Sequence, residues 1–179
     1  MKPGAWKAQV GSFARQLVLP AQRQLFDYWL SLCREDSWPQ REDLHPSNFK
    51  PLMANMLQIR QLPLPEGVKV EYAGHALWDV YGGELKDSTL VKGRWGRHAD
   101  YWRKIYTILA EARVPMNGHL RQVNDSGHLA LFWMRLPMQG RDGSPWLLGL
   151  DLPVSVSQLD ALLQRHAEEM GPPACDIEP

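Results

Sequence analysis

GHLRQVNDSGHLALFWMRLPMQGRDGSPWLLGLDLPV, residues 118–154, is the stretch that decides the fold of this chain. Three apolar runs, 119–123, 129–138 and 146–154, alternate with two short polar turns. Glycine, asparagine and aspartate tolerate the positive φ that tight hairpins need, and the flanking leucine, aromatic and β-branched residues suit a half-buried sheet. The stretch therefore predicts a three-stranded antiparallel meander.

The composition limits the class of protein. The 179 residues fit one domain of about 150 residues with tails. Twenty basic and twenty acidic side chains cancel, which argues against a general nucleic-acid or acidic-lipid binder. No apolar run reaches membrane-span length, residues 1–11 lack a signal-peptide core, and Cys33 and Cys175 have no disulfide-framework or zinc spacing. We expect a cytoplasmic protein with free thiols, no bound metal, and no nucleic-acid or membrane partner.

A helix and a hairpin are predicted ahead of the meander. Residues 1–20 have few periodic apolar positions, so we expect a flexible N-terminal arm. Apolar residues recur at helical spacing over 21–34, which predicts an amphipathic helix. A proline opens a short helix at 46–53, and strands follow at 56–62 and 68–74.

Two more helices separate this hairpin from the meander. Residues 75–81 predict a short helix that Gly82 and Gly83 end, because glycine supplies the left-handed conformation that closes helices. Residues 99–113 predict a longer helix with a broad apolar stripe, and the proline at 115 ends it. We expect that stripe to cover the sheet.

The predicted domain spans residues 21–155 and is followed by a C-terminal helix at 156–170. Ser157 is the predicted N-cap of that helix, with Asp160 as its capping-box partner. We expect residues 171–179 to form a disordered tail.

The order of these elements resembles the PAS fold. In that fold, helices cross one face of a five-stranded antiparallel sheet and leave a small internal cavity. Over residues 21–155 the chain is similar to a family of small, stand-alone bacterial PAS proteins. The matching motifs are Tyr28-Trp29, residues 46–52, Tyr72-Ala73-Gly74, residues 81–85 and Leu136-Pro137-Met138. The resemblance implies an α+β fold with flanking helices and a sensory or adaptor role, and none of the motif residues is catalytic.

The resemblance also implies where a ligand would bind. Aromatic walls with a few polar groups are typical of small-molecule pockets. The alternative is that the eight tryptophans simply fill the core and leave the cavity collapsed. Arg121 and Arg135 lie mid-strand, and the sequence does not decide whether either faces solvent or the interior. The cavity candidates are Trp78, Tyr81, Trp102, Tyr106, Arg121 and Trp133.

The cysteines and histidines bear on the cofactor. A covalent flavin photosensor needs a reactive cysteine on a short helix beside the flavin, whereas Cys33 precedes the sheet and Cys175 lies in the tail. A haem sensor needs an axial imidazole from the long helix, whereas His98 lies at or before its start and His75 opens the short helix. We therefore expect neither covalent flavin nor haem, and the cofactor stays unknown.

One basic segment precedes the long helix. It contains Arg94, Arg97 and His98 among tryptophans and tyrosines, and such groups can bind a nucleotide-sized anion beside a helix N-terminus. The alternative, which we favour, is a solvated loop whose aromatic residues pack inward.

Two classes of function remain, because no catalytic motif is present and we expect a non-enzyme. In the first, the protein is a sensor that binds a small molecule and signals through protein contacts. In the second, it is a ligand-free adaptor or dimerisation module, which holds a partner on an exposed sheet and on the helix face of Leu25, Trp29 and Leu32. Both predict an as yet unidentified protein partner, and we expect a homodimer.

Overall fold

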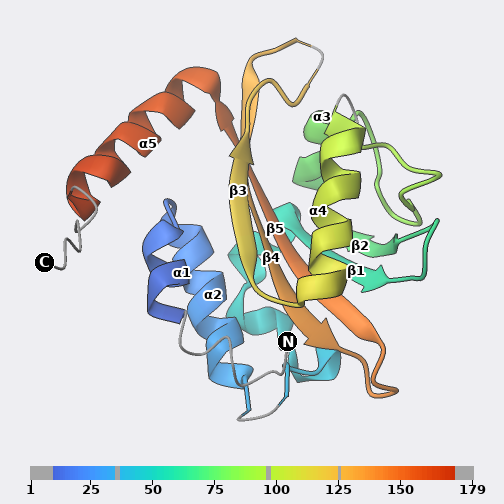
Figure 1. Cartoon of the computed structure of the whole chain (residues 1–179). Helices are drawn as coiled ribbons and strands as arrows, with labels where there is room; N and C mark the ends of the chain where they lie inside the picture. Colours follow the sequence, from blue (N-terminus) through green and yellow to red (C-terminus); the bar gives the residue numbers. More distant parts are fainter. Residues whose placement is uncertain (1–9, 35–36, 96–97, 125, 172–179) are drawn as a thin grey trace, which may run out of the picture.

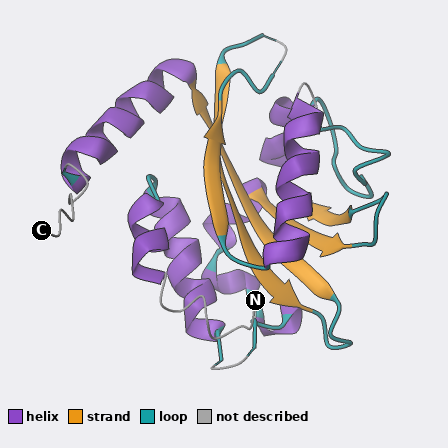
Figure 2. Cartoon of the chain, in the orientation of Figure 1, coloured by secondary structure: helices purple, strands orange, loops and turns teal. Residues whose placement is uncertain are grey.

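The computed structural model describes residues 10–34, 37–95, 98–124 and 126–171. A five-stranded antiparallel sheet lies between helices on its two faces (Figures 1 and 2). The strands are β1 Met56–Gln61, β2 Val68–Ala73, β3 Met116–Leu120, β4 Leu129–Gln139 and β5 Pro145–Ser155. The α-helices are α1 Val10–Gln16, α2 Pro20–Leu32, α3 Trp78–Tyr81, α4 Ala99–Ala112 and α5 Val156–Met170. Short 3-10 helices span Arg41–Asp43, Pro46–Asn48, Lys50–Asn55 and His75–Leu77.

The order of strands in the sheet is β2-β1-β5-β4-β3, so the N-terminal hairpin and the C-terminal meander meet where β1 pairs with β5. The long hairpin of β4 and β5 forms the middle of the sheet, with Arg135 opposite Gly149. This arrangement confirms the predicted α+β fold, the hairpin, the meander and the long helix. Gly82 ends α3 with a φ of 74°, as its position in the sequence predicts.

The two faces of the sheet carry separate apolar clusters. On one face, Leu131 and Trp133 of β4 pack with Trp102 and Leu109 of α4. On the other face, the alternate residues of β4 pack against α2, and Trp29 donates a hydrogen bond from its indole Nε1 to the Pro137 carbonyl at 2.9 Å. Helices therefore cover both faces at β4, so this strand offers no exposed sheet face of the kind that the adaptor alternative uses.

The N-terminal residues differ from the expected flexible arm where the structure describes them. Residues 10–16 form α1, and Leu17 after it is fully buried in the cluster beneath α2. The buried Gln22 side chain fixes the turn between the helices, because its Oε1 accepts hydrogen bonds from the backbone N–H groups of Val18 and Leu19. Residues 1–9 lie outside the described part of the chain.

The first strand of the meander begins and ends earlier than predicted. We expected residues 119–123, whereas β3 is Met116–Leu120 and pairs with β4 from Arg135 to Leu131. Gln122 then takes a left-handed conformation with φ of 53°, which turns the chain out of the sheet. The close approach of Gly118 to the Trp133 ring, which no apolar pattern reveals, sets this pairing.

The last helix, α5, spans Val156–Met170, and only its N-cap differs from the predicted one. Its N-cap is Ser155, not Ser157: Ser155 Oγ accepts a hydrogen bond from Gln158 N, and Gln158 Oε1 accepts one from Ser155 N. Asp160, the expected capping partner, instead pairs with Arg121. Of the expected tail at 171–179, only Gly171 is described.

Within the described ranges, no helix is both long enough and apolar enough to cross a bilayer.

Candidate functional site

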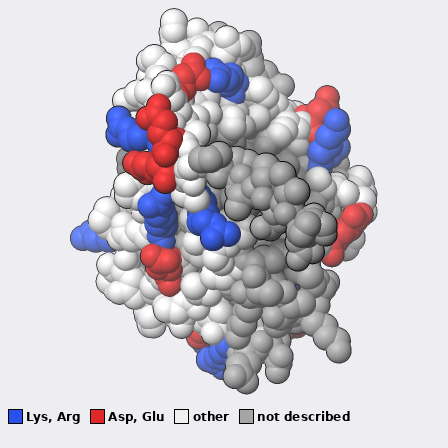
Figure 3. Space-filling view, turned by 60° about the vertical axis from the view of Figure 1, so that its left-hand side comes forward, with Lys and Arg blue, Asp and Glu red and all other residues white. Residues whose placement is uncertain are grey.

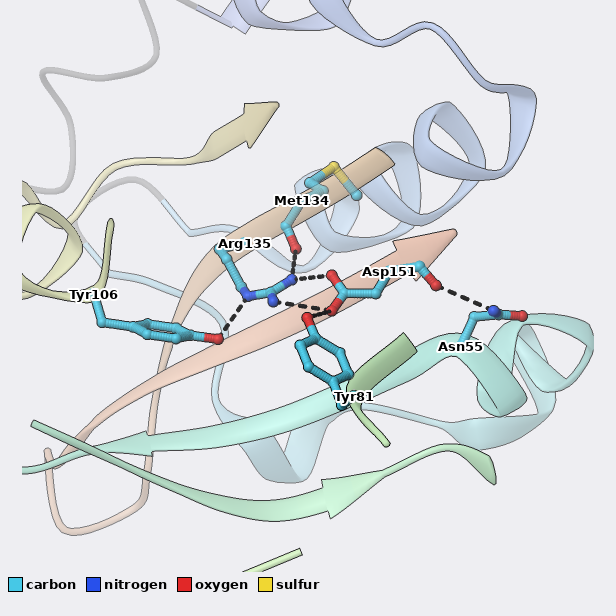
Figure 4. A network of polar contacts seen from close by, with 6 residues as sticks. All are labelled: Asn55, Tyr81, Tyr106, Met134, Arg135 and Asp151. Carbon is cyan, nitrogen blue, oxygen red and sulfur yellow. Dashed lines mark hydrogen bonds and ion pairs between the residues drawn. The ribbon is translucent and has the colours of Figure 1, made fainter. Parts of the chain in front are cut away.

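A buried ion pair lies at the centre of the molecule, between α4 and the sheet (Figure 4). Arg135 of β4 and Asp151 of β5 are each 0% exposed. Their side chains form two parallel contacts, Nη1 to Oδ1 at 2.5 Å and Nη2 to Oδ2 at 3.1 Å. A forked guanidinium–carboxylate pair of this kind is the strongest and most directional form of ion pair in proteins.

The sheet itself makes room for the guanidinium. Gly149 lies directly opposite Arg135 in the ladder. A Cβ at Gly149 would lie 3.2 Å from Arg135 Nη1 and 3.1 Å from Leu57 Cβ, which is tighter than ordinary packing. We infer that the absence of a side chain at this point lets the arginine cross to Asp151 without leaving the interior.

Two tyrosines complete the hydrogen bonding of the pair. Tyr81 of α3 donates its hydroxyl to Asp151 Oδ2 at 2.7 Å, and Arg135 Nε donates to the hydroxyl oxygen of Tyr106 of α4 at 3.1 Å. Arg135 Nη1 also donates to the Met134 carbonyl at 3.0 Å. The network thus joins β4, β5, α3 and α4. Its hydrogen bonds satisfy the buried charges, which would otherwise be costly to bury.

Aromatic rings enclose the guanidinium. Its Cζ lies 4.8 Å from the centroid of the Trp102 ring, 5.8 Å from that of Tyr106 and 5.9 Å from that of Trp133. Trp95 packs against the Tyr106 ring at a centroid distance of 5.5 Å. These cation–π contacts replace part of the hydration that burial removes from the arginine.

The electrostatics keep both tyrosines protonated. Burial raises the pKa of Tyr106 to about 12 and, together with the negative charge of Asp151, raises the pKa of Tyr81 well above its ordinary value. Burial alone would lower the pKa of Arg135, but the charge and hydrogen bond of Asp151 together with the two tyrosines outweigh burial and raise that pKa well above its ordinary value. The site therefore holds one cation, one anion and two neutral hydroxyls, and its geometry is that of a structural network with no exposed reactive atom.

Four of the six predicted cavity residues come together here. Tyr81, Trp102, Tyr106 and Trp133 all touch the network or its ring cluster and are buried. They pack on one another and on Arg135 in the space that we predicted for a ligand. Trp133 Nε1 is buried and has no hydrogen-bond partner among the described residues.

The other two cavity candidates are elsewhere, so their assignment to the cavity is wrong. The side chain of Trp78 is 50% exposed, because it lies on the outer side of the short helix that brings Tyr81 inward. Arg121 follows the end of β3 and forms a forked ion pair with Asp160 of α5 at the surface. That exposed pair raises the pKa of Arg121 and lowers the pKa of Asp160.

The predicted anion-binding residues contact different segments. Arg94 donates to the Gly82 carbonyl at 3.1 Å, while His98 Nε2 lies 3.1 Å from the Arg121 carbonyl oxygen. Glu84 and Asp87 line the same open hollow as Arg94, so its charge is mixed. Arg97 lies outside the described residues. Figure 3 shows acidic and basic side chains interspersed on the described part of one face.

The helix face proposed to hold a partner is already occupied. Leu25 and Trp29 are both 0% exposed and pack against the chain's own sheet, and Leu32 is partly buried beside the same cluster. The amphipathic pattern of α2 correctly identified an apolar face, but that face covers the sheet of the same chain.

Asp151 is the functional residue that we missed from the sequence. The available signal was a pair of opposite charges, each inside an apolar run: Met134-Arg135-Leu136 in one predicted strand and Leu150-Asp151-Leu152 in the next. A hairpin with one turn between those runs places the two charges close together. Arg135 was identified as an anomaly, but without Asp151 its face could not be assigned.

Metal chemistry has no support in this part of the chain: among the described residues, no three His, Cys, Asp or Glu side chains are grouped closely enough to bind an ion.

A family model described as PAS domain matches residues 18–150. Among solved structures, the chain is similar to one from a structural study of a fungal LOV domain photoreceptor, with 15% identity and a TM-score of 0.41. That alignment covers 57% of this chain and 75% of the other. A search of curated proteins gives no match.

Proposed function

Because the chain belongs to the PAS domain family, we propose that it is a signalling module that acts through protein contacts while its own side chains fill its interior. The observation that carries this proposal is the Arg135–Asp151 network. A ligand in the position expected for a PAS cavity would have to displace a paired arginine that is 0% exposed and three aromatic rings. Breaking such a pair is strongly unfavourable, which supports a ligand-free interior.

The surface supports the proposal that the protein acts through protein contacts. Two large apolar side chains project from the helices that cover the network: Trp78 of α3 is 50% exposed and Ile108 of α4 is 45% exposed. Tryptophan is among the residues that contribute most to protein–protein binding. The same helices carry Tyr81 and Tyr106, so a contact on their outer side is connected to the network by one helix turn or less.

The first test is the content of the purified protein. We expect an absorption spectrum with only protein bands, and no stoichiometric small molecule released on denaturation and detected by mass spectrometry. A stoichiometric compound bound in the interior would refute the filled interior and favour the second candidate function, a small-molecule sensor. The observation in favour of that candidate is the buried Trp133 Nε1, which interacts with the Tyr101 side chain but forms no well-aligned hydrogen bond and so offers a donor to a bound acceptor.

The second test is self-association, measured by sedimentation over a range of protein concentrations. If Trp78 is central to a homodimer contact, Trp78→Ser should weaken association by about tenfold or more. Arg141→Ser, in the exposed turn between β4 and β5, is the matched control and should leave association unchanged. Equal association of both variants and wild type would exclude Trp78 from the contact.

A further inference from the structure

A groove opens on the side of the molecule away from α4, between α1, β3 and α5. Its volume is about 460 Å³. Figure 1 shows α5 leaving the top of the sheet and running past α1. Both helices lie outside residues 18–150, so the groove combines residues of the matched domain, including β3 and β4, with segments on each side of it.

The groove exists because only the first turns of α5 rest on the sheet. Leu159 is fully buried against Ala130 and Phe132 of β4. The same helix face continues at spacings of three and four residues. Leu163 still packs against this cluster, and from Leu163 onward the face lines the groove. The lining residues of α5 are Leu163, His166, Ala167 and Met170.

The floor and walls are mainly apolar. Val18 and Phe132 face the α5 residues across the groove. Met170, at the end of α5, is 42% exposed although it is a large apolar residue. A groove of this volume falls within the range of small-molecule sites, which are mostly apolar with a few polar groups that orient the ligand.

The ionisable side chains that line the groove are all basic. Arg15 of α1, His119 of β3 and His166 of α5 line it, and no aspartate or glutamate among the described residues does. Arg15 is exposed and forms no ion pair with another described residue. His166 Nδ1 is buried and lacks a hydrogen-bond partner within the same ranges. The site therefore offers the unpaired cation of Arg15 and two imidazole rings beside an apolar surface.

We propose that this groove binds a small amphipathic anion, with an apolar body against Phe132 and Leu163 and a carboxylate or similar head group at Arg15 and His166. Arginine suits such a head group because its planar fork matches a carboxylate. The proposal is independent of the filled interior, since none of the groove residues belongs to the Arg135–Asp151 network. A ligand here would contact α1 and α5 at once and hold them together.

The test uses decanoate and decanol, which share an apolar chain and differ in charge, in titration calorimetry on the full chain below the micelle concentration. We expect decanoate to bind more tightly than decanol. Arg15→Gln should weaken decanoate binding by about five- to tenfold and leave decanol binding nearly unchanged. Arg165→Gln is the matched control, because Arg165 is an exposed α5 residue that does not line the groove.

A second variant tests the location. Ala167→Phe fills the groove from the exposed side of α5 and should weaken binding of both compounds, with the fold checked by circular dichroism. The proposal is overturned if decanoate does not bind to wild type. It is also overturned if wild type and Arg15→Gln bind each compound with the same affinity, or if Ala167→Phe binds both compounds as tightly as wild type. A compound that purified wild type carries and Ala167→Phe lacks is bound in this groove, whereas a compound that both proteins carry is bound elsewhere and tests the interior, so the two conclusions can fail separately.

Discussion

Replacement of Asp151 by asparagine removes the only charge that contacts the Arg135 guanidinium in the described structure and keeps the shape of the side chain. Arg135 is 0% exposed, so no rotamer change within the packed rings would give it water. Tyr81 loses a charged acceptor at 2.7 Å at the same time. Leaving one partner of a buried pair without its counter-ion costs about 3–5 kcal/mol.

This loss is large compared with the stability of an ordinary domain, which is about 5–15 kcal/mol. We therefore expect Asp151→Asn to fold but to unfold at a much lower urea concentration than wild type at neutral pH. Tryptophan fluorescence should report the transition, since Trp102 and Trp133 are buried beside the pair. An unchanged m-value would show that the shift reflects stability and not a change in the unfolded state.

Two further variants test whether loss of the buried ion pair causes this destabilisation. Asp160→Asn makes the same chemical change in an exposed pair, and we expect only a small shift. The double variant Arg135→Met with Asp151→Asn leaves no charge in the interior, so it should be less destabilised than the sum of the single changes. If Asp151→Asn unfolds at the wild-type urea concentration, or if the double variant is simply additive, the reasoning from a buried, mutually dependent pair is refuted.

Three other predictions follow from the same contacts. Burial raises the pKa of Tyr106 to about 12, so the folded state keeps a proton that the unfolded chain loses near its ordinary pKa. The contribution of Tyr106 to stability should be constant below about pH 10 and fall above it by up to about 1.4 kcal/mol per pH unit. Tyr81, whose pKa is also raised, adds to this fall, so urea unfolding of Tyr106→Phe should show a shallower decline than wild type. A Cβ at Gly118 would lie 2.8 Å from the Trp133 ring, so Gly118→Ala should destabilise the protein by about 1–3 kcal/mol in thermal unfolding. The control is Gly11→Ala, whose added Cβ meets no atom within 4 Å. If Gly11→Ala destabilised the protein as much as Gly118→Ala, the steric explanation would be contradicted. Arg121→Gln breaks the surface pair to α5, so hydrogen exchange should quicken in α5 and stay unchanged in β4; equal exchange in α5 would mean that the pair does not anchor the helix.

Sequence patterns predicted the fold well where apolar runs are bounded by turn-forming residues. The long helix, the first hairpin and the outer limits of β4 and β5 follow from spacing, glycine and proline. The start of β3 could not be predicted in this way, because Met116-Asn117-Gly118 has little strand character and is held by pairing with β4 and by the Trp133 ring above Gly118. Tertiary contacts outweigh local propensity at such an edge.

The candidate site was predictable in part, for a similar reason. The four buried aromatic residues could be placed between α4 and the sheet from the helix stripe and the strand order. That they fill the space depends on Arg135, whose orientation requires the cross-strand register with Gly149 and the presence of Asp151. Neither is contained in the pattern of either strand alone.

The pattern of apolar residues does not determine which side chains of β4 turn toward α4, because every residue from Ala130 to Met138 is buried. Alternation of polar and apolar side chains usually fixes the register of a strand, and a slip by one residue turns each side chain to the opposite face. A slip here would exchange one apolar set for another, but it would also press Arg135 against the rings of α2 and leave Asp151 without its cation. Both uncompensated charges would be costly. One salt bridge thus distinguishes the correct hairpin from its otherwise well-packed mispaired alternative.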